Sequence, residues 1–271
     1  MAYRVAVIMS LYRGDRLTFV KEALESLYMQ SYPVDIFVQQ DGPIDAAVEV
    51  LVDDALINGK IHYLGKRGKN RGLAYSLNEL IEQVQEQRYR YIARMDADDI
   101  SLPDRIAKQV AFLESNQEVD VAGGYIEEFS DEVDYHKIVQ YPLKHDEMFR
   151  FFAKRVPLAH VSVMYRDRFF EKAGLYPTTS PTNEDTLMWM EGFRNGCRFA
   201  NIPEVLVRVR ISKAFFGRRG GLKKAWSDLK DRLKVIKTLG YNSTAYGYAL
   251  AVFMVNISPS GIKKFLYKRV R

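Results

Sequence analysis

The first 124 residues alternate short apolar runs with amphipathic segments, and this alternation restricts the fold more than any other feature. Helical spacing of apolar residues begins near residue 17, recurs over residues 73–84 and again from Pro103 to about residue 115. Strands that alternate with helices form parallel β–α–β units, so the sequence predicts an α/β fold with a mostly parallel sheet. The predicted strands span residues 4–9, 34–39, 60–64, 89–95 and 119–124.

Polar residues follow three of these strands at the point where each strand ends. They are Ser10, the pair Gln40–Asp41, and the segment from Asp96 to Asp99. In parallel sheets, ligands bind beyond the carboxyl ends of the strands. We therefore expect these three groups to form one site.

The third group, within RMDADDIS at residues 94–101, carries three carboxylates in four positions. Like charges about 4 Å apart repel by about 4 kcal/mol at an effective dielectric constant of about 20, so the cluster needs a counterion or full solvation. Carboxylate oxygens suit Mg²⁺ or Mn²⁺, whereas the four histidines and Cys197 lack the ligand spacing of a zinc site. The alternative is that Asp98 and Asp99 are solvated and only favour the start of the next helix.

The segments VAVIMSLYRGD, FVQQDGP, NRGLAYSLN, RMDADD, HVSVMYR and NEDTLMW occur in an order that resembles glycosyltransferase family 2. The resemblance covers about residues 3–212, and the ordered series is more specific than the acidic motif alone. It implies an inverting enzyme with a GT-A fold that transfers a hexose or N-acetylhexosamine from a nucleotide-diphospho-sugar.

The resemblance also implies roles for the residues that would hold the donor. Asp96 would bind the ribose, Asp98 the divalent ion that bridges the diphosphate, and Asp99 would orient the loop. Ser10 would line the base pocket. Such an ion stabilises the charge that develops on the leaving nucleoside diphosphate.

Most relatives have two aspartates where this chain has Gln40–Asp41. A glutamine amide accepts from uracil N3–H while it donates to a ring carbonyl, so uracil stays the favoured base. The alternative makes Gln40 a turn residue before Asp41. Asn70 and Arg71, in the basic loop of residues 65–72, match the family's segment beside the nucleotide, and a solvated surface loop is the alternative for them.

On the acceptor side, the resemblance implies that Asp185 in NEDT is the base that removes the proton from the attacking hydroxyl. Glu184 is its rival, and the alternative for both is a pair of acids that favours a helix N-terminus. His160 matches a family position that faces the acceptor. A hydrogen-bonded core histidine is the equal alternative there.

The chain carries its positive charge at one end. Residues 213–271 contain 14 Lys/Arg and two acids, a net charge of +12, whereas residues 1–212 have a net charge of −6. The apolar run at residues 246–257 is too short to cross a bilayer. Ile262, Phe265 and Leu266 share one face among basic residues, which is typical of a helix in an anionic membrane interface. A packed helix pair with solvated charges is the alternative, and Arg218 and Arg219 are candidates to clamp an acceptor's diphosphate.

These patterns predict a catalytic domain at residues 1–212, with a nucleotide-binding half at 1–124 and an acceptor half at 125–212. Residues 213–271 would form a membrane-associating segment. One cysteine and no secretory signal favour a cytoplasmic enzyme at the inner face of the membrane. Its acceptor would be a lipid-linked saccharide of O-antigen-like or capsule-like synthesis, with no nucleic-acid partner. The rival functions are a nucleotidyltransferase on a related sheet, and a non-enzymatic membrane or nucleic-acid binding module.

Overall fold

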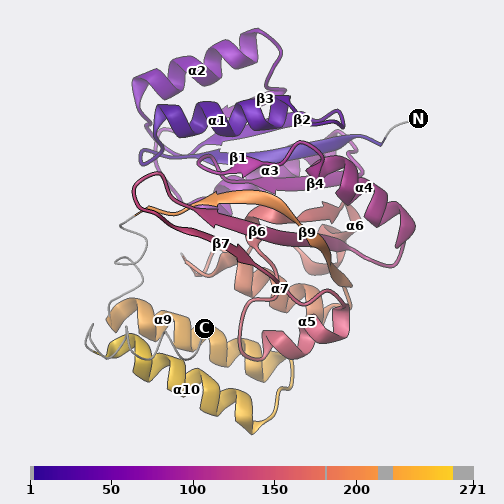
Figure 1. The fold of residues 1–271 in the computed structure, drawn as a ribbon, viewed down its shortest axis with the longest axis vertical. Coiled ribbons are helices and arrows are strands. Elements are labelled where there is room, and N and C mark those ends of the chain that lie inside the picture. Colours follow the sequence, from indigo (N-terminus) through magenta and orange to yellow (C-terminus); the bar gives the residue numbers. More distant parts are fainter. Residues whose placement is uncertain (1–2, 181, 213–221, 259–271) are drawn as a thin grey trace.

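The computed structural model describes residues 3–180, 182–212 and 222–258, which form a nine-stranded sheet covered by helices on both faces (Figure 1). The strand order is β3-β2-β1-β4-β8-β6-β9-β5, and β7 pairs with β6. The strands are β1 (Val5–Leu11), β2 (Asp35–Gln40), β3 (Tyr63–Lys66), β4 (Tyr91–Met95), β5 (Ile100–Ser101), β6 (Val121–Phe129), β7 (His136–Val139), β8 (Met164–Arg166) and β9 (Phe199–Arg210). The helices are α1 (Leu17–Tyr28), α2 (Ala46–Ile57), α3 (Leu73–Glu86), α4 (Arg105–Ser115), α5 (His145–Phe152), the 3-10 helix η1 (His160–Ser162), α6 (Arg168–Ala173), α7 (Glu184–Arg194), α9 (Leu222–Thr238) and α10 (Ser243–Ile257).

The predicted α/β fold is confirmed. Strands β3, β2, β1 and β4 are parallel neighbours, as the alternation of strands and helices predicts. Beyond β4 the sheet is mixed, because β8 runs antiparallel to both β4 and β6, while β6 and β9 are parallel. The first four strands therefore form the regular half of the sheet, and their carboxyl ends share one edge.

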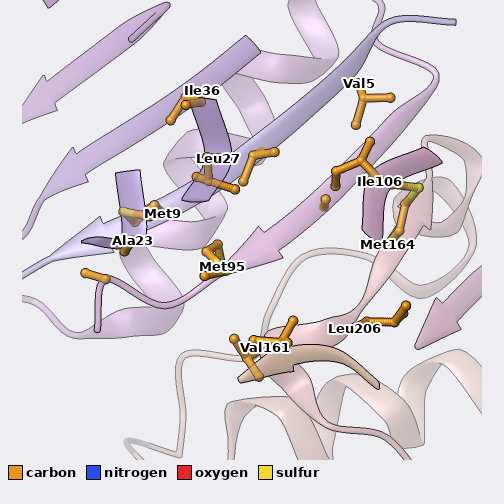
Figure 2. Packing of buried hydrophobic residues seen from close by; sticks show 14 of the residues in the cluster. Val5, Met9, Ala23, Leu27, Ile36, Met95, Ile106, Val161, Met164 and Leu206 are labelled. Atoms are coloured by element: carbon orange, nitrogen blue, oxygen red, sulfur yellow. The ribbon is translucent and has the colours of Figure 1, made fainter. Parts of the chain in front are cut away.

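Strand β1 is buried on both faces, which explains its continuous apolar sequence. Val5, Val7 and Met9 point into one core cluster, and Ala6 and Ile8 point into another, because successive side chains of a strand alternate between faces. Figure 2 shows the first cluster, where side chains of β1 lie with those of α1, β2, β4 and α4.

Helix α2 is absent from the sequence prediction. Val48, Val50 and Val52 alternate in this segment, and a run of valines spaced by two is typical of a strand. The backbone is nevertheless helical, and Asp45 caps the helix because its carboxylate accepts from the backbone N–H of Ala47 at 2.9 Å.

Helices α9 and α10 form an antiparallel pair beneath α5 and α7, at the end of the molecule opposite α2 (Figure 1). Leu229, Ile236, Ala245 and Ala249 join the two helices through a small apolar core. None of the described helices is long and apolar enough to cross a membrane. Residues 213–221 and 259–271, with Arg218, Arg219 and the face of residues 262–266, lie outside the described residues.

Candidate active site

The strand ends bring the predicted donor residues to one edge of the sheet. Ser10 of β1 is paired with Gln39 of β2, and Leu11 is paired with Gln40. On the other side of β1, Met9 is paired with Met95 of β4, one residue before Asp96. Gln40, Ser10 and the acidic cluster therefore project from three adjacent parallel strands.

Arg94 is the counterion of the acidic cluster. Its side chain is 4% exposed, and its two terminal nitrogens donate to the two carboxylate oxygens of Asp96, one of them at 2.7 Å. A planar guanidinium matches a carboxylate in this bidentate way and fixes its orientation. Asp96 is 38% exposed, so its carboxylate is held from below and open to the site.

Arg210, at the end of β9, fixes the rest of the acidic loop. Its backbone N–H donates to the buried carboxylate of Asp99 at 2.8 Å, and its Nε donates to the carbonyl oxygen of Asp98 at 3.0 Å. Burial and the repulsion of Asp96 raise the pKa of Asp98 to about 6, and the same causes raise the pKa of Asp99. The cluster therefore holds more negative charge than Arg94 balances.

A divalent cation fits this cluster. Asp96, Asp98 and Asp99 each offer an oxygen, and the three oxygens lie within 4.8 Å of one another. All the donors are carboxylate oxygens, which Mg²⁺ and Mn²⁺ prefer. Asp98 is the member whose carboxylate makes no hydrogen bond to Arg94 or Arg210, so it has the most freedom to bind an ion.

Gln40 and Asp41 have different roles in the structure. Asp41 is buried and accepts from the backbone N–H groups of Arg71 and Gly72 at 2.7 and 2.8 Å, and it pairs with Arg67 at 2.9 Å. Both oxygens of Asp41 are thus used to hold the loop that starts α3. The Oε1 atom of Gln40 is buried and has no hydrogen-bond partner among the residues that the structure describes. Because a buried acceptor without a donor is costly, Gln40 Oε1 is the better candidate to receive a ligand N–H.

Arg71 contributes to the loop mainly through its backbone. Its guanidinium lies 4.0 Å from the ring centre of Tyr75 and 3.5 Å from Glu79, and half of the side chain is exposed. Asn70 donates to the carbonyl oxygen of Asp41 at 3.1 Å. A Cβ at Gly42 would lie 2.6 Å from the backbone nitrogen of Asn70, so this close approach requires the glycine.

Glu184 and Asp185 begin α7 and face the same charges as the acidic cluster. Burial and the neighbouring Asp185 raise the pKa of Glu184 to about 7, and the charges of Arg94 and Asp96 also act on it. Asp185 accepts from Thr186 through the backbone N–H at 2.6 Å and the hydroxyl at 3.2 Å. Burial raises its pKa as well, while Arg94 opposes the shift. Both carboxylates therefore lie near Arg94, and a base works best with a pKa near the working pH.

The raised pKa of Glu184 predicts how stability depends on pH. The unfolded side chain ionises near pH 4.5, and the folded one near pH 7, so wild-type stability falls as pH rises between these values. Glu184→Gln should therefore match the wild type at pH 4 and exceed it at pH 8, by on the order of 3 kcal/mol. Urea unfolding at both pH values measures this. Glu171→Gln, at an exposed acid of α6, should show the same difference from wild type at both, and equal behaviour of the two variants would contradict the burial of Glu184.

His160 packs among aromatic rings below the site. Its Nε2 lies 2.8 Å from the hydroxyl of Tyr176, and its ring meets Trp189 edge-on at 5.9 Å. Burial and the nearby Arg94 hold its pKa well below the usual value, so the ring is neutral at physiological pH. These contacts fit a hydrogen-bonded core histidine, and they leave a role toward the acceptor as a prediction.

Two arginines at the centre of this site were missed by the sequence analysis. Arg94 carried a usable signal, since a charged residue inside a buried strand needs a partner, and Asp96 two residues later lies on the same face. No local sequence pattern could have identified Arg210, because it contacts Asp99 across 111 residues of sequence.

Comparison with known proteins shows which class this fold and site define. A mannosyltransferase from Pyrobaculum calidifontis, solved with GDP-Man and Mn²⁺, superposes with a TM-score of 0.64 at 17% identity, over 98% of this chain and 79% of that one. TarS from S. aureus superposes with a TM-score of 0.64 at 16% identity, over 93% of this chain and 43% of that one. The fold is therefore the GT-A fold.

The sequence comparisons narrow the class to one family. The profile described as "Glycosyl transferase family 2" matches residues 6–174. A glycosyltransferase of Haemophilus influenzae is 33% identical, and the amylovoran biosynthesis glycosyltransferase AmsE of Erwinia amylovora is 29% identical, each over 98% of both chains. The UDP-Gal:α-D-GlcNAc-diphosphoundecaprenol β-1,3-galactosyltransferase of Escherichia coli is 26% identical, over 98% of this chain and 96% of that one. The chain belongs to glycosyltransferase family 2 and is a glycosyltransferase.

Proposed function

We propose that this enzyme transfers a hexose or N-acetylhexosamine, with inversion, from a UDP-sugar to a hydroxyl of a lipid-linked saccharide during bacterial surface-polysaccharide synthesis. The reaction takes place at the cytoplasmic face of the membrane and requires Mn²⁺ or Mg²⁺. The proposal rests mainly on one observation. Three parallel strands end at the same edge of the sheet, which places the buried amide oxygen of Gln40 on the same edge as the carboxylates of Asp96, Asp98 and Asp99.

The donor is inferred from what the two ends of this edge can bind. Gln40 Oε1 accepts a hydrogen bond, as the N3–H of uracil requires. Asp98 would hold the ion that neutralises the diphosphate, and Asp96 would receive the ribose, as the family resemblance implies. When bound, the ion supplies Lewis-acid stabilisation of the leaving diphosphate. Related structures contain UDP and UDP-GlcNAc in TarS and GDP-Man with Mn²⁺ in the mannosyltransferase, which agrees with a metal-dependent nucleotide-sugar site.

The acceptor is inferred from the relatives and from the C-terminal helices. AmsE is named for amylovoran biosynthesis, and the E. coli relative is named for a diphosphoundecaprenol-linked acceptor. An enzyme that acts on such a lipid must reach a membrane surface. Helix α10 has exposed apolar residues at spacings of three and four. Residues at this spacing share one face of a helix, so they form an apolar stripe. The stripe consists of Tyr246, Leu250, Met254 and Ile257, which are 38–59% exposed.

A UDP-binding experiment tests the donor site. The wild type should bind UDP more tightly with Mn²⁺ than without it, because an ion held at Asp98 would neutralise charge on the diphosphate. Asp98→Asn should lose this difference, while Asp54→Asn, at an exposed acid of α2, should keep it. Calorimetric titration of UDP with and without Mn²⁺ measures this difference in UDP affinity. An unchanged Mn²⁺ effect in Asp98→Asn would remove Asp98 from the metal site.

A screen of UDP-sugars then tests the reaction. The enzyme should release UDP slowly and only with Mn²⁺ or Mg²⁺, as water replaces the missing acceptor. A nucleotidyltransferase would instead consume a nucleoside triphosphate and release diphosphate. A non-enzymatic binding module would release nothing and would show no metal-dependent nucleotide affinity.

The α10 stripe should support membrane binding. Leu250→Gln combined with Met254→Gln should weaken binding to vesicles with anionic lipid at least tenfold, since burial of each apolar side chain contributes about 1.5–3 kcal/mol and tenfold needs about 1.4 kcal/mol. Ile57→Gln is the control, because Ile57 is 81% exposed on α2 at the far end of the molecule. Cosedimentation measures all three proteins, and equal binding would mean that the stripe does not touch the membrane.

A further inference from the structure

A cavity lies near the proposed base, between the start of α7 and the helix pair α9–α10. Its volume is about 220 Å³, less than that of a pocket for a whole drug-sized ligand. Thr186 lines the cavity, and its hydroxyl also donates to Asp185 at 3.2 Å. Thr186 therefore connects the cavity to the proposed base.

Arg232 of α9 gives this cavity a positive charge that is not held in a direct ion pair with any carboxylate of the described residues. Its guanidinium lines the cavity and donates to the carbonyl oxygen of Phe152 at 2.7 Å. Among the described residues, no carboxylate lies within 4.0 Å of it. Burial lowers its pKa, and the charges of Asp185 and Asp228 partly oppose this shift. A partly buried cation without a directly paired anion loses hydration that the protein does not fully replace, so this site suits an anionic ligand group.

The two carboxylates that also line the cavity are already engaged elsewhere. Asp231 accepts from Ser180 and from Asn183, each at 2.8 Å. Asp228 accepts from Asn183 and pairs with Lys224, both at 3.0 Å. They hold the chain that leads into α7, and neither of them forms an ion pair within 4.0 Å of Arg232.

The opposite side of the cavity is apolar and opens toward solvent. Val252 and Phe253 of α10 line it, and Val252 is 38% exposed. The ring of Phe253 meets that of Trp226, which is 62% exposed, at 5.8 Å. The cavity is thus lined by a partly buried cation and by apolar side chains of the same helix pair that carries the α10 stripe.

We propose that this cavity binds the diphosphate of the acceptor at Arg232 and the first isoprenoid carbons at Val252 and Phe253. The proposal rests on the lipid-linked acceptor of the proposed function and assigns it a place. Because the cavity shares Thr186 with Asp185, the sugar attached directly to the diphosphate is the one whose hydroxyl reaches the base. The rest of the lipid leaves across the exposed apolar side chains toward the membrane.

Calorimetry with three soluble probes tests this, in EDTA so that no divalent ion draws diphosphate to the acidic cluster. Farnesyl diphosphate should bind at least tenfold more tightly than inorganic diphosphate or farnesol. Arg232→Gln should weaken farnesyl diphosphate binding at least tenfold, while Lys234→Gln, an exposed cation on the same helix, should change it less than twofold. Val252→Asp, at a partly exposed position that tolerates a polar side chain, should also weaken it at least tenfold.

Other results overturn the proposal. Equal binding of inorganic diphosphate would indicate a free-phosphate site, and equal binding of farnesol would indicate an apolar site without a role for Arg232. Unchanged affinity in Arg232→Gln, or in a folded Val252→Asp if Arg232→Gln does not fold, would exclude this cavity. Mn²⁺-dependent UDP binding, measured beside these titrations, should be the same in all variants. Its absence in the wild type would refute the proposed function, whereas its presence without farnesyl diphosphate binding would refute only the cavity.

Discussion

Asp185→Asn is expected to lower kcat by about 100-fold or more while the affinity for the UDP-sugar stays within a few-fold. A general base contributes about 10²–10⁴-fold, and it acts on the acceptor hydroxyl rather than on the donor. Asn keeps the size of Asp and an oxygen that can still accept from Thr186, so the start of α7 should stay intact. Steady-state kinetics and UDP-sugar titration on the same samples separate the two effects.

Glu184→Gln provides the matched comparison, because the two carboxylates are adjacent and both feel the charge of Arg94. The structure supports each of these two carboxylates as the base, for different reasons. Asp185 is fixed by Thr186, and Glu184 has a pKa of about 7, near the working pH. If Asp185→Asn is nearly fully active and Glu184→Gln is inactive, then Glu184 is the base. Loss of UDP-sugar affinity in Asp185→Asn would place its role on the donor side instead.

The sequence predicted the half of the sheet that carries the donor site, because local patterns determine it. Each strand from β1 to β4 is a short apolar run, and parallel pairing alone brings Ser10, Gln40 and Asp96 to one edge. The mixed half of the sheet could not be predicted from local patterns, because β8 and β9 pair with strands far away in sequence. Helix α2 was missed because alternating valines are also typical of a strand, and only Asp45 marks the helix start.

The residues that hold the proposed donor and base residues in place were harder to predict than the donor and base residues themselves. Asp99 is held by Arg210, and the chain before Glu184 is held by Asp228 and Asp231 of α9. Such contacts join segments through the tertiary fold, and no local pattern signals them. They also show that α9, which begins beyond the predicted boundary at residue 212, contacts the acceptor half directly.

Arg94 connects the donor and acceptor sides of the site. It holds Asp96, and its charge acts on Asp98 and Asp99 as well as on Glu184 and Asp185. A single buried cation therefore balances part of the charge on both carboxylate groups. The balance is incomplete on the donor side, where burial and the repulsion of Asp96 together raise the pKa of Asp98. A divalent ion removes that repulsion, so metal and Arg94 should support the same carboxylates.

Arg94→Met should therefore destabilise the enzyme, and Mn²⁺ should restore part of the loss. Removal of one partner of a buried ion pair costs about 3–5 kcal/mol, and the partial exposure of Asp96 places this case near the lower value. Arg90→Met on the same chain segment should cost less than about 1 kcal/mol, because Arg90 is 41% exposed and its pair with Glu114 is near the surface. Urea unfolding measures both losses.

Repeating the unfolding with Mn²⁺ separates a role in charge balance from a role in packing alone. An ion that binds only the folded state stabilises it, and the gain rises with its affinity. Without Arg94 the carboxylates of Asp96, Asp98 and Asp99 attract the ion more strongly, so Mn²⁺ should stabilise Arg94→Met more than the wild type. Equal stabilisation of both proteins by Mn²⁺ would mean that the ion and the guanidinium act on different carboxylates, so that Arg94 does not balance charge at the metal site.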